Sequence, residues 1–208
     1  MTNSSDFLYP FLDDAAEPAD ASALLEDLAR SAEAKWRESE ELSSSVLERE
    51  SSHLSALGAE LARRAGAGGR VFTVGNGGSA TDAMDLAAEL PVPALCLAAD
   101  PAVFSALAND VGIGNAFTRQ LAALARPNDT VIGFSTSGDS ENVVAVLQEA
   151  DRQGLLTIGF AGYDGGSMGR LGLEHVMVVP SQSVHRVQEA QCALSAALCR
   201  SVAEALVA

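Results

Sequence analysis

The chain has 208 residues, of which 48% are apolar and 20% are charged, enough apolar material for the core of one ordinary domain. Its 28 acidic and 13 basic residues give a formal net charge of -15, which repels nucleic acid and anionic lipid surfaces. We therefore expect a single domain without a broad nucleic-acid or membrane surface. A small phosphorylated ligand stays compatible with this charge, because backbone N–H groups at helix starts supply local positive potential.

The three cysteines, Cys96, Cys192 and Cys199, lie in apolar or helical stretches without Cys-x-x-Cys spacing. We expect buried thiols rather than a disulfide framework or a zinc site. The first residues lack a basic region followed by an apolar one, and no run approaches the roughly 18 apolar residues that span a bilayer. These features favour a cytoplasmic protein.

Residues 1–20 are rich in Asp, Ser, Ala and Pro, which predicts a partly ordered N-terminal segment, although the apolar cluster at 7–12 should dock on something. Over residues 21–65, apolar residues recur with helical spacing among good helix formers. This predicts one or two amphipathic helices. Their apolar face could pack on this chain's own core or on another subunit, and the sequence leaves both open.

After residue 69 short apolar runs alternate with helical stretches. Alternation of this kind predicts an α/β domain with a mainly parallel sheet covered by helices on both faces, so residues 21–208 form a single domain. The expected strands are residues 70–74, 94–97, 129–134, 156–160 and 175–179, and the expected helices are residues 82–90, 117–125, 142–153 and 184–207.

The loop Gly75-Asn76-Gly77-Gly78-Ser79 follows the first expected strand and opens a helix. Glycines let the backbone approach an anion, and the Ser79 hydroxyl could donate a hydrogen bond and cap the helix. The loop is neither a Walker loop nor a good dinucleotide fingerprint. A phosphate site and a simple tight turn are both compatible with it.

A second loop, Ser135-Thr136-Ser137-Gly138-Asp139-Ser140, also follows a strand and precedes a helix. Its hydroxyls could cap that helix or bind an anion at the helix start. Ligands of doubly wound sheets bind beyond the carboxyl ends of the strands, so two such loops favour a shared anion site. Neither loop contains Lys or Arg, which indicates recognition by amides and hydroxyls.

Five runs in chain order carry a resemblance to a known family: GNGGSATDAMDLAAEL, ALANDVGIGNAFTRQL, IGFSTSGDSENVV, GYDGGSMG and HRVQEAQ. Together they resemble the phosphoheptose (sedoheptulose 7-phosphate) isomerase branch of the sugar isomerase (SIS) family, over roughly residues 54–206. The resemblance implies a flavodoxin-like three-layer sandwich with a five-stranded parallel sheet. It also implies a homotetramer with active sites at subunit interfaces.

The resemblance further implies a phosphosugar site, to which Gln188 would reach from the last helix. Asp100 would lie near the sugar, although it could equally cap a helix or turn before Pro101. The phosphosugar-binding residues implied in this way are Asn76, Gly77, Ser79, Asp100, Ser135, Thr136, Ser137, Ser140 and Gln188.

The chain departs from the family at the catalytic and metal positions. The family uses a Glu and a His as base and acid, and several members bind zinc through two His, a Glu and a Gln. Here those four positions are Asp85, Glu89, Gln188 and Ala196. We expect no cofactor, with a divalent ion on Asp85, Glu89 and Gln188 as the open alternative, because an oxygen-only set favours harder ions than zinc.

His185 stands three residues before Gln188, where the isomerases typically carry Asp. It could replace the missing acid or base beside Glu89, bind phosphate as a cation, or be a surface histidine. The sequence thus predicts a phosphosugar isomerase with an altered site. The alternative is a non-catalytic sugar-phosphate-binding protein that acts through a partner, resembling family members that bind a replication initiator. A looser resemblance, at residues 6–11 and 183–186, to members with accessory roles in hydrogenase maturation also predicts a protein partner.

Overall fold

The computed structural model describes residues 21–208, with side chains from Leu24 onward, so the apolar cluster at 7–12 lies outside the described residues. The chain divides into two compact units, residues 1–38 and 39–208. One helix, α1 (Ala21–Gly66), covers the stretch for which the sequence allowed one or two. In its first part Leu24, Leu25, Leu28 and Trp36 are exposed.

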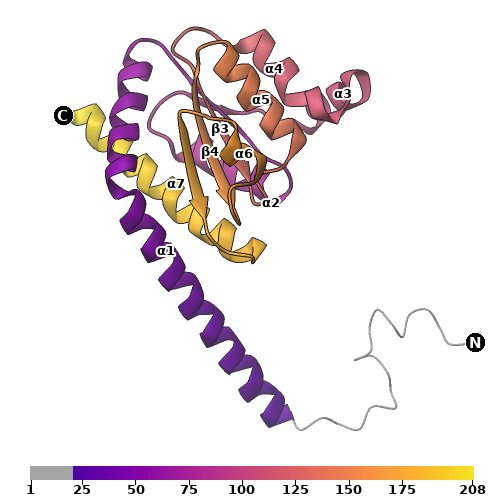
Figure 1. The fold of residues 1–208 in the computed structure, drawn as a ribbon, viewed down its shortest axis with the longest axis vertical. Coiled ribbons are helices and arrows are strands. Elements are labelled where there is room, and N and C mark those ends of the chain that lie inside the picture. Colours follow the sequence, from indigo (N-terminus) through magenta and orange to yellow (C-terminus); the bar gives the residue numbers. More distant parts are fainter. Residues whose placement is uncertain (1–20) are drawn as a thin grey trace, which may run out of the picture. The chain divides into compact units, whose positions relative to one another are not determined.

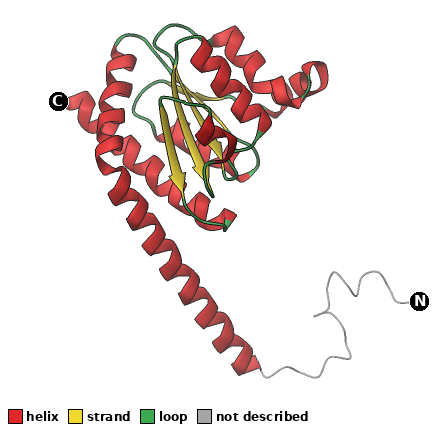
Figure 2. Cartoon of the chain, in the orientation of Figure 1, coloured by secondary structure: helices red, strands yellow, loops and turns green. Residues whose placement is uncertain are grey.

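The second unit contains a five-stranded sheet with the strand order β2-β1-β3-β4-β5, and every neighbouring pair is parallel (Figures 1 and 2). This is the α/β architecture expected from the sequence. The strands are β1 (Val71–Val74), β2 (Ala94–Cys96), β3 (Thr130–Ser135), β4 (Leu156–Gly162) and β5 (His175–Val179). The helices after α1 are α2 (Gly78–Glu89), α3 (Pro101–Val111), α4 (Ala116–Leu124), α5 (Glu141–Arg152), α6 (Gly166–Arg170) and α7 (Val184–Val207), with a short 3-10 helix η2 (Ile113–Asn115).

Two apolar clusters cover the two faces of the sheet, because successive side chains of a strand point to opposite faces. In β3, Ile132 and Phe134 join the cluster that includes α2 and α7, whereas Val131 joins the one that includes α4 and α5. The Phe134 and Phe160 rings stack at 4.7 Å between centroids. The result is a helix–sheet–helix sandwich. The helices packed on both faces hold each strand in place, and with it the loop that follows the strand.

α7 is the one helix, among those described, that is long and apolar enough to cross a membrane by length and composition, although the sequence has no unbroken apolar run of that length. Its Val187, Leu194 and Leu198 are fully buried against the sheet. The apolar character of this helix therefore serves the core.

Three local features differ from the sequence-based expectations. The helices α3 and α6 were not predicted; α3 begins at Pro101, and its signal was the preceding Asp100, which caps it. Ser79 lies inside the first turn of α2, whose N-cap is Gly77 without a side-chain cap, so the expected capping by Ser79 is wrong. Cys192 is exposed and Cys199 is partly buried, so only Cys96 of the three cysteines is buried as expected.

Candidate functional site

The glycine loop and the hydroxyl loop leave the same edge of the sheet, because β1 and β3 pair in parallel with Val74 opposite Gly133. Asn76 of the first loop and Asn142, in the first turn of α5, join them. The Asn76 amide nitrogen donates to the Asn142 oxygen at 2.7 Å, and the Asn142 nitrogen donates back at 2.9 Å. Asn142 is 5% exposed and was not predicted as a site residue. This pair of hydrogen bonds fixes the distance between the two loops.

The serines of the second loop contact one another instead of capping α5. Ser140 is the N-cap residue of α5 but makes no side-chain cap hydrogen bond. The Ser135 hydroxyl lies 2.9 Å from the Ser140 hydroxyl and 3.4 Å from that of Ser137. These hydroxyls are gathered at one point beside the start of a helix, where backbone N–H groups favour an anion.

A groove of about 310 Å³ opens beside these loops. The acidic Glu141 in it would repel a phosphate but can accept hydrogen bonds from sugar hydroxyls. The arrangement suits a ligand with an anionic end at the serines and a hydroxylated body in the groove. The groove is lined by Asn76, Ile113, Gly114, Ser140, Glu141 and Asn142.

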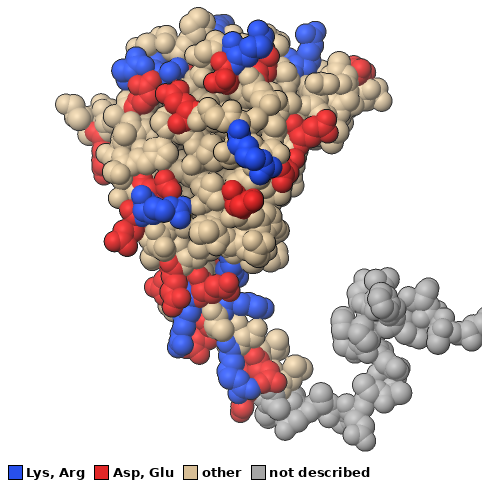
Figure 3. All heavy atoms as spheres, in the orientation of Figure 1, with Lys and Arg blue, Asp and Glu red and all other residues tan. Residues whose placement is uncertain are grey.

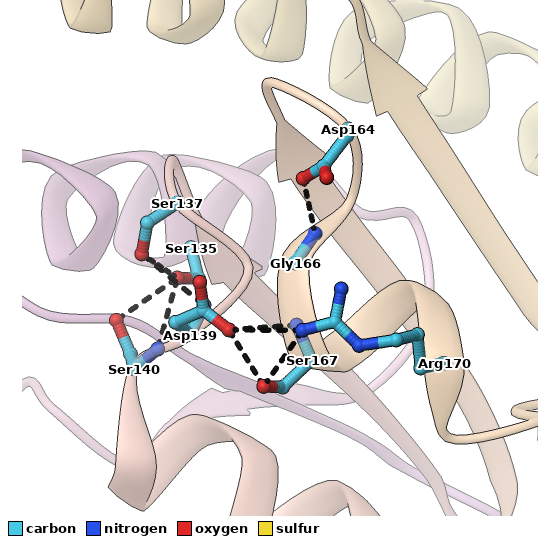
Figure 4. A network of polar contacts seen from close by, with 8 residues as sticks. All are labelled: Ser135, Ser137, Asp139, Ser140, Asp164, Gly166, Ser167 and Arg170. Atoms are coloured by element: carbon cyan, nitrogen blue, oxygen red, sulfur yellow. Dashed lines mark hydrogen bonds and ion pairs between the residues drawn. The ribbon is translucent and has the colours of Figure 1, made fainter.

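Figure 4 shows how the hydroxyl loop is held against α6. Asp139 accepts hydrogen bonds from the Ser167 backbone N–H at 2.7 Å and from the Ser167 hydroxyl at 2.6 Å. The bond from the Ser167 hydroxyl, followed by that from its N–H, lowers the pKa of Asp139. The Met168 N–H donates to the Gly138 carbonyl at 2.8 Å. The GYDGGSMG run thus holds the loop in place.

Gln188 of α7 lies against the glycine loop, and its predicted contact with a phosphosugar stays a prediction. Its Nε2 atom would lie 2.1 Å from a Cβ built on Gly78, so the amide packs directly over the first turn of α2. Only a residue without a side chain at position 78 allows this approach.

A small cavity of about 40 Å³ lies between α2 and α7. The Asp82 Oδ2 and Ser195 Oγ atoms are buried without a hydrogen-bond partner among the described residues. Burial, followed by the nearby charge of Asp85, raises the pKa of Asp82 to about 6. Such a carboxyl can exchange protons near neutral pH, and no sequence signal singled it out. The lining residues are Asp82, Asp85, Leu86, Glu89, Cys192 and Ser195.

Replacing Asp82 with asparagine is expected to change the pH dependence of stability. The pKa of Asp82 is raised in the folded state from 3.8 to about 6, so its favourable contribution is present below pH 3.8 and lost as pH rises through about 6. The variant should therefore gain about 1 kcal/mol over the parent at pH 8, discounting for solvent screening, and nothing at pH 3.5. Urea denaturation at both pH values measures this. Equal differences at the two pH values would contradict the raised pKa.

The candidate metal-binding and acid–base residues do not meet at one point, as the ligands of a zinc ion would have to. Among residues 21–208, no three His, Cys, Asp or Glu side chains are grouped so as to hold a metal ion. Asp85 and Glu89 line the cavity, but neither Gln188 nor Ala196 does. Asp85 and Ala196 supply no imidazole, so the residues present do not fit the zinc set that the resemblance implies.

Asp100 and His185 line neither the groove beside the two loops nor the cavity between α2 and α7. Asp100 accepts from the backbone N–H groups of Ala102 at 2.9 Å and Val103 at 3.1 Å, as a helix cap does. His185 is exposed in the first turn of α7, one helical turn before Gln188. Its role stays a prediction.

The SIS domain pattern matches residues 36–162, a segment that contains both loops. The chain belongs to the SIS domain family. It is 41% identical over 146 residues to the phosphoheptose isomerase of Aquifex aeolicus, which covers 66% of this chain and 76% of that relative. It is 44% identical over 145 residues to the enzyme of the same name from Paramagnetospirillum magneticum, covering 65% and 75% of the two chains.

Solved SIS structures agree with this assignment. The phosphoheptose isomerase of Neisseria gonorrhoeae superposes with a TM-score of 0.79 at 30% identity, over 85% of this chain and 99% of that chain. The NanR protein of Vibrio vulnificus, solved with ManNAc-6P, shares the fold alone, with a TM-score of 0.57 at 15% identity over 88% and 66% of the two chains. This SIS domain protein is therefore phosphoheptose isomerase-like in sequence and in fold.

Proposed function

We propose that this protein binds a phosphorylated sugar, with the phosphate on the hydroxyl loop and the sugar in the groove beside it. The observation that carries the proposal is the cluster of Ser135, Ser137 and Ser140 hydroxyls at the start of α5, which the Asn76–Asn142 pair ties to the glycine loop. The predicted contacts of Thr136, Gly77, Ser79 and Gln188 with this ligand belong to the same proposal. Asp100 caps α3, so it would act on the ligand only indirectly, by fixing the conformation of the backbone at the start of that helix.

The proposed reaction is an aldose–ketose isomerisation with an altered acid–base pair. Such a reaction moves a proton between adjacent carbons, so it needs a base and an acid within reach of both. Glu89 and Asp82 line the cavity between α2 and α7, which shares no lining residue with the groove, so the reaction further requires the sugar to extend from the hydroxyl loop toward that cavity. His185 starts the helix that carries Gln188. We assign the base to Glu89 and give His185 and Asp82 as the candidate acids.

A binding-only function is the second candidate, and Ala196 is the residue that favours it. Alanine cannot carry a proton, so a sugar phosphate could serve here as a signal that changes how the chain binds a partner protein. The NanR structure with ManNAc-6P supports the idea that this fold also serves sugar-phosphate binding. Proton exchange beside the carbonyl of a ketose phosphate in heavy water, followed by NMR, separates the two functions: exchange means an enzyme.

The binding proposal is tested by thermal denaturation with inorganic phosphate and with a heptulose 7-phosphate. A ligand at 100 times its dissociation constant should stabilise the fold by roughly 2.7 kcal/mol. Ser137→Ala should lose most of this stabilisation, whereas Ser105→Ala, whose hydroxyl bonds only to α3 carbonyls, should keep it. Equal stabilisation of both variants, or none in the parent, would contradict the site.

We further propose that the protein forms a homo-oligomer, specifically a tetramer. The exposed apolar residues Leu24, Leu25, Leu28 and Trp36 support it, because a run of such side chains on one helix marks an association surface. Light scattering measures it, and a monomer at micromolar concentration would contradict it. We also place the protein in the cytoplasm, in line with the packing of α7 into the core.

A further inference from the structure

A second groove lies at the opposite end of the sheet from the phosphosugar site. β3 connects the two places: it begins at Thr130, next to this groove, and ends at Ser135 of the hydroxyl loop. The groove has a volume of about 460 Å³, within the range of small-molecule sites. Its lining residues are Arg64, Ala125, Arg126, Pro127, Asn128, Gln153, Gly154 and Leu155.

A buried carboxylate makes one wall of this groove rigid. Asp129 is fully buried and accepts hydrogen bonds from the backbone N–H groups of Arg70 at 2.7 Å and Arg126 at 2.9 Å. The Arg70 guanidinium lies 3.1 Å from the same carboxylate and pairs with it. The turn over residues 126–129 is thereby fixed to the start of β1, and Asn128 within it has a φ of 73°. The groove is pre-formed.

The lining of this groove contains two arginines and no acidic residue, whereas the whole chain has a net charge of -15. Among the described residues, nothing forms an ion pair or hydrogen bond with the Arg126 guanidinium. The buried Asp129 carboxylate pairs with Arg70 instead. Arg64 pairs with Glu60 through its Nε atom at 2.7 Å. Figure 3 shows Lys and Arg side chains, interspersed with Asp and Glu, along the upper end of the molecule, where Figure 1 places the end of α1 and the loops that enter β3 and β4.

We propose that this groove binds a small phosphorylated metabolite, with its phosphate on Arg64 and Arg126 and its body against the apolar wall. Guanidinium groups match the geometry of phosphate oxygens and form the strongest hydrogen bonds of this kind. Ala125, Pro127 and Leu155 supply apolar contact for the body of the ligand. This site is distinct from the hydroxyl loop and does not depend on the proposed function.

The test is a titration of the 15N-labelled full chain with inorganic phosphate and, separately, with glucose 6-phosphate, followed by NMR. Amide signals of residues 126, 128, 129 and 153–155 should shift with either probe, with tighter binding of the sugar phosphate. Arg126→Gln should weaken binding at these signals by about 10- to 100-fold, the effect of losing a charged hydrogen-bond partner. Ser137→Ala should leave the binding measured at these signals unchanged.

Arg152→Gln is the matched control, because Arg152 pairs with Glu149 and does not line the groove. The variant should bind both probes at residues 126–129 as the parent does. The proposal is overturned if shifts are confined to residues 75–79 and 135–140, or if Arg126→Gln and Arg152→Gln behave alike. Equal affinity for inorganic phosphate and glucose 6-phosphate would overturn the assignment to a metabolite. Unchanged signals elsewhere verify that each variant is folded.

Discussion

Gly138→Ala is expected to abolish the stabilisation of the protein by phosphate or a phosphosugar. Gly138 has a φ of 71°, and a Cβ built on it would lie 2.1 Å from the Gly165 carbonyl oxygen. That oxygen belongs to the backbone of the segment that holds the hydroxyl loop, so the loop must move away from α6. The serine hydroxyls and the Asp139–Ser167 contact would then lose their arrangement. Thermal denaturation with and without inorganic phosphate measures the effect.

Gly172→Ala is the matched control for this prediction. Its φ is 70°, but nothing lies within 4 Å of the added Cβ, so it carries only the strain of a left-handed alanine. That strain is about 1–2 kcal/mol, which lowers the melting temperature by roughly 2–8 °C and leaves ligand binding intact. If Gly138→Ala keeps the full ligand-induced shift, the hydroxyl loop is not the phosphate site.

The second large effect concerns the acid–base pair that we propose is altered: the unmodified protein should isomerise a heptulose 7-phosphate slowly, and Asp85→His with Ala196→His should raise the rate. Asp85 lines the cavity with Glu89, and Ala196 is partly buried next to Ser195 of that cavity. A general acid–base pair contributes on the order of 10²–10⁴ in rate, so even partial restoration is measurable. Steady-state turnover of the heptulose phosphate is the readout.

The control is Asp85→Asn with Ala196→Gln, which introduces polar side chains of similar size that cannot transfer a proton near neutral pH. It should stay at the level of the parent protein. An ordinary enzymatic rate in the unmodified protein would show that the loss of the family's histidine at 196 has no consequence. Glu89, Asp82 and His185 would then be the residues to substitute first.

The sequence by itself determined the five strands, four of the helices after α1 and the position of the two loops, but it missed α3 and α6. Helical and strand periodicities are local, so β5 and α7 match their predicted ranges, β1 starts one residue later than predicted, and β3 is shifted by one residue at both ends. The Asp100-Pro101 pair carried the signal of a capped helix start, which the structure has. Glycine and serine clusters after two strands then indicated a ligand edge, because parallel strands end at one edge of a sheet.

Only the tertiary structure decided which side chains meet. Asn76 and Asn142 are 66 residues apart, Asp139 and Ser167 are 28 apart, and the His53 and His175 rings, 2.8 Å apart between nitrogens, are 122 apart. The same holds for the approach of Gln188 to Gly78 and for the raised pKa of Asp82. Local patterns set the period and the ends of each element. Crossover paths and helix rotation set these contacts, and both depend on how the whole core packs.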